Sequence, residues 1–214
     1  MWVYTKARRV TLSAVTPLPL NFHDRDPLKL ARALLGMDLV HVVRGRARVG
    51  RIVETEAYVG PHDLASHSSK GRTKRTEVMF GPAGHAYIYL IYGMHLCVNV
   101  VTGEGAAVLI RALEPGDGLK GLRTDGPGRL TKALGLSLDL NALPLDRAPL
   151  FISQGEPLPA RHVETSRRIG VDYAGEWAEK PFRFHDRRSQ FVSQPRVVKT
   201  VTKKLSQKVS QTSR

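Results

Sequence analysis

The sequence predicts one α+β domain built on a curved, largely antiparallel β-sheet with helices around it. Three observations lead to this fold class. Short segments rich in branched and aromatic residues follow one another through tight turns, as residues 39–43 and 47–54 do about a turn at 44–46. Helical patterns are few and have clear ends. The length of 214 residues suits a single domain, and no internal repeat is present.

Three stretches predict helices. Asp26 can cap a helix that begins at Pro27, and leucine and alanine side chains form its apolar face up to Gly36. A second helix is expected over residues 127–135. A short third helix is expected over 163–169.

The best hairpin signal lies in the middle of the chain. Residues 87–92 and 95–101 read as two strands about a turn at Gly93, so we expect a protruding β-hairpin. Further strands are expected over 106–113 and 182–184.

The two ends differ in composition from the rest. Residues 1–20 contain few acids and no clear period, which predicts a flexible N-terminal arm. Residues 191–214 predict a basic, disordered C-terminal tail. The folded domain is therefore expected over 21–190.

Charge is the strongest global signal. The formal net charge is +14 and the isoelectric point is near 10.3. Residues 195–214 carry six basic residues and no acid, which leaves +8 for the rest of the chain. A polyanionic partner explains a basic body, whereas a basic tail on an ordinary enzyme explains only part of the charge. Nucleic acid is favoured over a membrane, because no basic amphipathic helix and no membrane-spanning apolar run is present.

The expected compartment is a reducing cytoplasm. Cys97 is the only cysteine, so an internal disulfide is excluded, and no apolar signal segment follows the basic N-terminus. Cys97 lies among apolar residues of an expected strand and is interpreted as a core residue.

Two carboxylates two residues apart are the first candidates for chemistry. On a strand, Glu54 and Glu56 point to the same face, and Tyr58 continues that face if the strand stays regular. The pair suits acid–base work or a metal, and a solvent-facing pair at a strand end is the alternative.

A metal site is not expected. His62, Asp63 and His67 do not have a helical ligand spacing, and no cysteine joins them. His67 is interpreted as a hydrogen-bonding or stacking group, with an idle loop histidine as the alternative.

A dense group of cations lies in the long loop over residues 60–86. Lys70, Arg72, Lys74 and Arg75 would repel one another without counter-charge, and DNA phosphates would supply it. The alternative is a solvated, mobile loop.

Tyrosines concentrate in the expected hairpin. Tyr87 and Tyr89 share one face of its first strand and could be core residues. Tyr92 lies at the tip, where exposure argues against a packing role. A wedge between stacked bases would explain an aromatic residue there.

At these residues the sequence resembles the alkyladenine DNA glycosylase family, also called methylpurine or 3-methyladenine DNA glycosylases. The order and spacing of the motifs agree from about Arg32 to Phe184. The matching segments are residues 50–58, 65–68, 87–99, 109–115, 126–130, 174–177 and 180–184.

The resemblance implies an enzyme that flips damaged purines out of double-stranded DNA and hydrolyses the N-glycosidic bond. The implied substrates are 3-methyladenine, hypoxanthine and ethenoadenine, the product is an abasic site, and no lyase activity and no cofactor are implied. The protein is expected to be a monomer that needs no membrane. The alternative is a non-catalytic nucleic-acid-binding module on the same fold. A nucleoside hydrolase is the third possibility, and the basic body and the residue at the hairpin tip argue against it.

The resemblance also implies roles for single residues. Glu56 would be the general base that activates water, and Arg111 would hold that water and the carboxylate. Three side chains would enclose the flipped base, and they are Tyr58, His67 and Tyr89. Asn99 would oppose the amino group of guanine, and Tyr92 would fill the gap left in the duplex. Asp172 departs from the family pattern, where glycine is expected, and so bears on substrate range.

Overall fold

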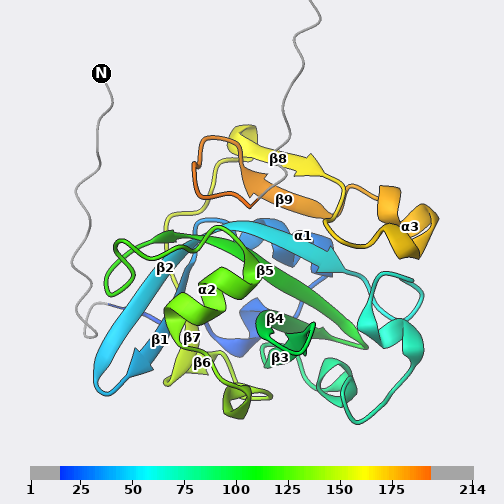
Figure 1. The fold of residues 1–214 in the computed structure, drawn as a ribbon, viewed down its shortest axis with the longest axis horizontal. Coiled ribbons are helices and arrows are strands. Elements are labelled where there is room, and N and C mark those ends of the chain that lie inside the picture. Colours follow the sequence, from blue (N-terminus) through cyan, green and yellow to red (C-terminus); the bar gives the residue numbers. More distant parts are fainter. Residues whose placement is uncertain (1–14, 194–214) are drawn as a thin grey trace, which may run out of the picture.

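The strands of the chain join in one curved antiparallel sheet (Figure 1). The computed structural model describes residues 15–193. Within this range the strands are β1 (Asp38–Val43), β2 (Arg46–Tyr58), β3 (Ala86–Ile91), β4 (His95–Gly103), β5 (Ala106–Pro115), β6 (Asp146–Arg147), β7 (Leu150–Ser153), β8 (Val163–Ser166) and β9 (Arg183–Asp186). The expected α+β class with an antiparallel sheet is confirmed.

The order of the strands makes β2 the centre of the sheet. The main path runs β3-β4-β5-β2-β1-β7-β6, and β9 adds to β2 beyond the end of β1, with β8 outside it. Residues 54–56 of β2 therefore have β5 on one side and β9 on the other. This placement surrounds the two glutamates with backbone that is already hydrogen-bonded.

One helix prediction is wrong. Residues 163–166 form strand β8, in which Val163 pairs with Asp186 and Ser166 with Arg183 of β9. The branched side chains of Val163 and Thr165 favour an extended backbone, and pairing with β9 decides the outcome.

The helices are short. They are α1 (Pro27–Ala33), α2 (Pro127–Leu134) and α3 (Glu176–Glu179), with 3₁₀ turns at Leu20–Phe22, His67–Lys70, Glu77–Phe80, Leu138–Leu140, Ala160–His162 and Asp172–Ala174. Asp26 caps α1 by accepting a hydrogen bond from the Lys29 amide at 3.0 Å, as expected from the sequence. Gly36 follows α1 at φ 92°, where an added Cβ would lie 2.0 Å from the Glu156 carbonyl oxygen. Only glycine fits there.

The two faces of the sheet differ in chemistry. Leucines of α1 and α2 pack with Ile52, Val100 and Ile110 into the main apolar core. Thr55 faces α1 and donates a hydrogen bond to the Ala31 carbonyl. The pairing of β2 with β5 shifts in register between Ile52 and Thr55, so Glu54 and Glu56 lie on the face opposite Thr55 although Ile52 faces the core. The main core thus occupies one face of the sheet. The other face carries the two glutamates together with smaller apolar clusters, one of which contains Tyr87, Val101 and Ala107.

The structure also describes a few residues on either side of the expected domain, 21–190. Thr16 and Leu18 lie within the expected arm, yet both make backbone hydrogen bonds to the segment that contains β7. Val192 and Ser193 lie within the expected tail, yet both are buried. The remaining residues of the expected arm and tail, 1–14 and 194–214, lie outside the described residues. Among residues 15–193, no helix is long and apolar enough to cross a bilayer.

Candidate active site

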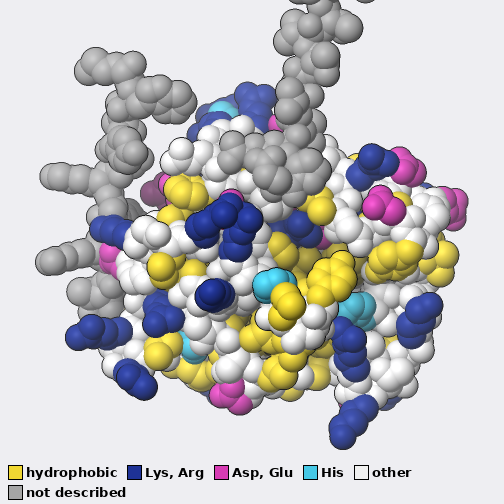
Figure 2. Space-filling model, in the orientation of Figure 1, with side chains coloured by type: hydrophobic (Ala, Val, Ile, Leu, Met, Phe, Trp, Pro, Cys, Tyr) yellow, Lys and Arg dark blue, Asp and Glu magenta, His cyan; other side chains and the backbone are white. Residues whose placement is uncertain are grey.

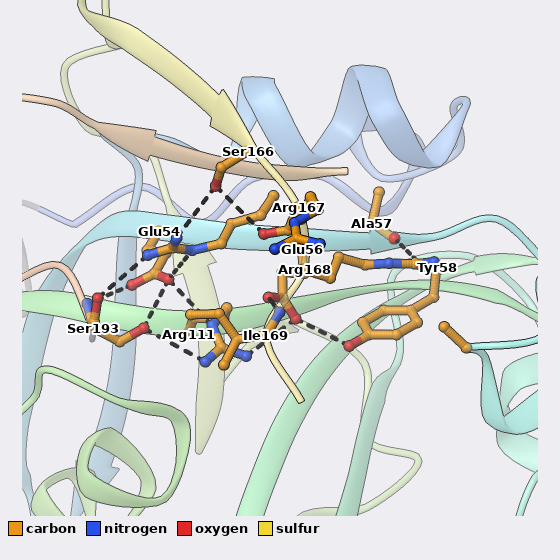
Figure 3. A network of polar contacts seen from close by, with 12 residues as sticks. Glu54, Glu56, Ala57, Tyr58, Arg111, Ser166, Arg167, Arg168, Ile169 and Ser193 are labelled. Atoms are coloured by element: carbon orange, nitrogen blue, oxygen red, sulfur yellow. Dashed lines mark hydrogen bonds and ion pairs between the residues drawn. The ribbon is translucent and has the colours of Figure 1, made fainter. Parts of the chain in front are cut away.

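Glu56 lies at the centre of a buried hydrogen-bond network (Figure 3). Its Oε2 accepts hydrogen bonds from the Tyr58 hydroxyl at 3.0 Å and from Arg111 Nη1 at 3.1 Å. Its Oε1 accepts a hydrogen bond from the Ile169 amide at 2.8 Å. Burial and the charge of Glu56 raise the pKa of Tyr58 well above its ordinary value, so the hydroxyl stays protonated and donates.

Glu54 lies beside Glu56 and shares Arg111 with it. Arg111 Nε donates to Glu54 Oε1 at 3.1 Å, and Arg183 Nε donates to the same oxygen at 2.6 Å. Burial raises the pKa of Glu54, but the two guanidinium groups outweigh that effect and hold it below its ordinary value. Both carboxylates are fully buried, so they are not a solvent-facing pair.

A cavity of about 270 Å³ opens next to this network. Its lining is largely aromatic and apolar, and it includes Tyr58, His67, Tyr87, Tyr89, Cys97, Asn99, Leu109, Arg111, Ile169, Val171 and Tyr173. Figure 2 shows hydrophobic side chains gathered around a hollow on this face of the molecule, with basic side chains near its edge. Glu56 does not itself line the cavity, but its three hydrogen-bond partners do.

His67 and two tyrosines form one wall of the cavity. The His67 ring lies edge-on to Tyr89 with 4.4 Å between centroids, and its Nδ1 is 2.9 Å from the Tyr87 hydroxyl. Burial, helped by the positive charge of Arg75, lowers the pKa of His67 to about 4. His67 is therefore neutral at pH 7. The structure brings together Tyr58, His67 and Tyr89, the three side chains expected to enclose a base, in the lining of one cavity.

Asn99 is buried in the cavity wall on β4. Its Nδ2 donates a hydrogen bond to the Tyr87 carbonyl at 2.9 Å, which fixes the orientation of the amide. Cys97, on the same face of β4, also lines the cavity, and burial raises the pKa of its thiol. The expectation that Cys97 is buried is thus confirmed.

Tyr92 occupies the turn between β3 and β4. The Met94 amide donates to the Ile91 carbonyl, and Tyr92 and Gly93 have φ values of 53° and 69°. Tyr92 is 83% exposed, and it also lines the cavity.

The four cations of the basic loop do not share one environment. Lys70 and Arg75 line a second hollow of about 180 Å³ that shares His67 and Tyr173 with the cavity. Arg75 also lies 5.3 Å from the centre of the Tyr89 ring and donates to the Leu90 carbonyl. Arg72 instead pairs with Glu77 at 3.7 Å, and Lys74 is exposed outside the hollow.

The candidate metal ligands do not converge. Asp63 is buried and paired with Arg168, whose guanidinium lies 4.8 Å from the centre of the Tyr58 ring. His62 lies edge-on to Trp177. No group of three or more potential metal ligands occurs within residues 15–193.

Sequence reasoning did not find several residues of the site. The main-chain amide of Ile169 has no side-chain signature. Arg183 lies within a family motif that assigns it no role, and Ser193 falls within the expected tail. Asp172 is exposed and is not among the lining residues, although its neighbours Val171 and Tyr173 are.

Comparison of the sequence with known proteins identifies the family of this chain. The family model of methylpurine-DNA glycosylases matches residues 21–190. A "Putative 3-methyladenine DNA glycosylase" of Myxococcus xanthus (strain DK1622) is 60% identical over 180 residues, which is 82% of this chain and 93% of that protein. A protein of the same name from Legionella pneumophila (strain Corby) is 50% identical over 179 residues, 82% of this chain and 97% of its own. Another, from Anaeromyxobacter dehalogenans (strain 2CP-C), is 51% identical over 182 residues, 83% of this chain and 87% of its own.

These matches define the class of protein as a DNA glycosylase, a hydrolase of N-glycosyl bonds in DNA. The chain belongs to the methylpurine-DNA glycosylase family.

Proposed function

We propose that this protein flips damaged purines out of double-stranded DNA into the aromatic cavity, where Glu56 activates the water that hydrolyses the N-glycosidic bond. The product is an abasic site. The substrates are the 3-methyladenine, hypoxanthine and ethenoadenine class of lesions. One observation carries the proposal, which is that Tyr58, Arg111 and Ile169 all line the cavity and each donates a hydrogen bond to the buried carboxylate of Glu56.

The hydrogen bonds to Glu56 support its role as the base. A carboxylate has about four lone-pair positions. Three are occupied by described donors, two on Oε2 and one on Oε1, which leaves a position on Oε1 for water. The carboxylate then takes a proton from the water as it attacks the sugar carbon. It also stabilises the positive charge that develops on the sugar as the base departs.

The aromatic lining supports the choice of substrate. Flat purines stack on tyrosine faces, and an alkylated, cationic purine is attracted to them. His67 is neutral at pH 7 and does not repel such a cation. Asn99 lies in the wall, where its amide would oppose the exocyclic amino group that guanine has and hypoxanthine lacks.

Water as the nucleophile supports a monofunctional enzyme. A glycosylase with lyase activity uses an amine to form a Schiff base with the sugar. No lysine is among the described residues that line the cavity. Strand cleavage therefore requires a later chemical or enzymatic step.

Contacts with DNA follow from the surface around the cavity. Tyr92 would take the place of the flipped base in the duplex. Lys70 and Arg75, which line the hollow next to the cavity, would bind the phosphates of the flipped nucleotide. Arg72 and Lys74 would add weaker contacts from the outer side of the same loop.

Duplex oligonucleotides that each carry one defined lesion test the proposal. Wild-type protein should convert the lesion to an abasic site, detected as strand cleavage only after alkali. Glu56→Gln should bind lesion DNA but excise it about 10²- to 10⁴-fold more slowly. Glu114→Gln is the matched control, because Glu114 is 49% exposed on β5, and it should excise like the wild type. Binding without any excision by wild-type protein would falsify the enzymatic role.

A further inference from the structure

Glu54 is a buried acid that has no direct role in the proposed activation of water by Glu56. It does not line the cavity, yet its two oxygens accept four hydrogen bonds. Two come from the guanidinium groups of Arg111 and Arg183. The other two come from Ser193, whose amide donates to Oε2 at 2.7 Å and whose hydroxyl donates to Oε1 at 2.8 Å.

Arg111 connects Glu54 to Glu56. Its Nε is bound to Glu54, and its Nη1 is bound to Glu56. Because the guanidinium group is planar and rigid, holding its Nε edge also sets the direction in which Nη1 points. The third nitrogen, Nη2, lies 3.5 Å from Ser193 Oγ.

Arg183 connects the same acid to the other side of the site. Its Nε donates to Glu54, its Nη2 to the Ser193 carbonyl at 3.2 Å and its Nη1 to Ser166 Oγ at 3.2 Å. Ser166 ends β8, and three residues later the Ile169 amide donates to Glu56. The cluster around Glu54 thus binds Arg111 directly and binds Ser166 in the segment that leads to Ile169.

We infer that Glu54, Arg183 and Ser193 form a positioning clamp that holds Arg111, and through it Glu56, in the orientation that activates water. The inference rests on the proposed role of Glu56 as the base. The clamp residues touch neither the cavity nor the reacting atoms, so they act through Arg111. Two carboxylates and two guanidinium groups balance in charge, so the buried cluster carries no net charge that water would have to solvate.

The clamp also gives residues 191–193 a function. Ser193 is 139 residues from Glu54 in the sequence. It nevertheless donates two hydrogen bonds to the Glu54 carboxylate, one from its main-chain amide and one from its hydroxyl. Excision should therefore depend on a segment that does not line the cavity.

Full-length Ser193→Ala and Arg183→Lys test the clamp by single-turnover excision and by lesion-DNA affinity. Ser193→Ala removes one hydrogen bond to Glu54 and should slow excision about 3- to 10-fold. Arg183→Lys keeps the charge but cannot bridge Glu54, Ser166 and Ser193 together, so the expected loss is about 10- to 100-fold. Affinity for lesion DNA should stay within about twofold of wild type in both.

Ser153→Ala is the matched control. Ser153 on β7 is only 1% exposed, and its hydroxyl has no hydrogen-bond partner among the described residues. This variant should therefore excise lesions like the wild type. Circular dichroism at the assay temperature shows that each variant is folded. If Arg183→Lys does not fold, Ser193→Ala decides the question.

A double mutant separates positioning from general loosening. If Ser193 acts through Glu56, Ser193→Ala should not slow the residual excision of Glu56→Gln any further. Equal slowing in both backgrounds, or wild-type rates in folded Ser193→Ala and Arg183→Lys, would overturn the clamp. Neither result would contradict the proposed function. That proposal fails if the wild type does not excise the lesion or if Glu56→Gln excises it at the wild-type rate.

Discussion

The conformation of Tyr92 makes a sharp prediction, because neither packing nor turn geometry explains a tyrosine there. Three hairpin turns share one geometry, with a non-glycine residue near φ 50° followed by a glycine. In the other two turns the first residue is Arg44 or Glu104, both exposed and polar. Asparagine, aspartate or glycine would suit this position better. Because the aromatic side chain is mostly exposed, we expect it to act by contact with DNA.

Tyr92→Gly should change the stability of the protein little. The left-handed conformation costs a non-glycine residue about 1–2 kcal/mol, which glycine avoids. Glycine in turn loses more conformational entropy on folding, by about 0.5–1 kcal/mol. Since the side chain is 83% exposed, little apolar burial is lost. The free energy of unfolding should therefore stay within about 1 kcal/mol of wild type, as measured by denaturant titration.

Excision from stable duplex should nevertheless fall in Tyr92→Gly. Stacking of a base on an aromatic ring contributes about 1–3 kcal/mol, and its loss shifts the flipping equilibrium about 5- to 150-fold. The loss should be smaller when the lesion lies in a mismatch or bulge, where the stack is already weak. Fluorescence of 2-aminopurine beside the lesion reports unstacking directly. Glu104→Gly is the control, since it changes the equivalent turn residue and removes no ring.

Two results would refute this reasoning. Unfolding of Tyr92→Gly would mean that the side chain is part of the core. Flipping and excision at wild-type levels from fully paired duplex would mean that another group enters the DNA helix.

Three further predictions follow from buried or charged groups. Asn99→Ser should allow some excision of undamaged guanine, seen as new alkali-sensitive sites, and their absence with hypoxanthine excision intact would place the filter elsewhere. Burial lowers the pKa of His23 to about 4. Between about pH 6.5 and pH 4 the unfolded state therefore binds more protons than the folded state. The free energy of unfolding should fall by on the order of 3 kcal/mol as the pH falls through that window. His23→Leu should reduce this dependence in urea titrations and leave the share of His67, whose pKa burial also lowers to about 4; an unchanged pH profile would contradict the prediction. Lys70→Gln should reduce the slope of log affinity against log salt by about 0.9, unlike Lys29→Gln on α1, and equal slopes would remove Lys70 from the phosphate contacts.

Local signals in the sequence were the reliable ones. The cap at Asp26 and the placement of Glu54 and Glu56 on one face each depend on neighbouring residues, and the structure confirms both. The prediction over 163–169 failed because the short segment had no strong period, and pairing with β9 decided its conformation.

The sequence by itself determined the fold class, the family motifs, the basic charge and the strand faces, because these properties reside in composition and near-neighbour spacing. Only the tertiary structure decided which groups meet at the two glutamates. Arg111, Arg183, the Ile169 amide and Ser193 lie between 55 and 139 residues from the glutamate they bind. A buried carboxylate must be satisfied by donors from whichever elements pack around it, and a backbone amide leaves no trace in the residue type that supplies it.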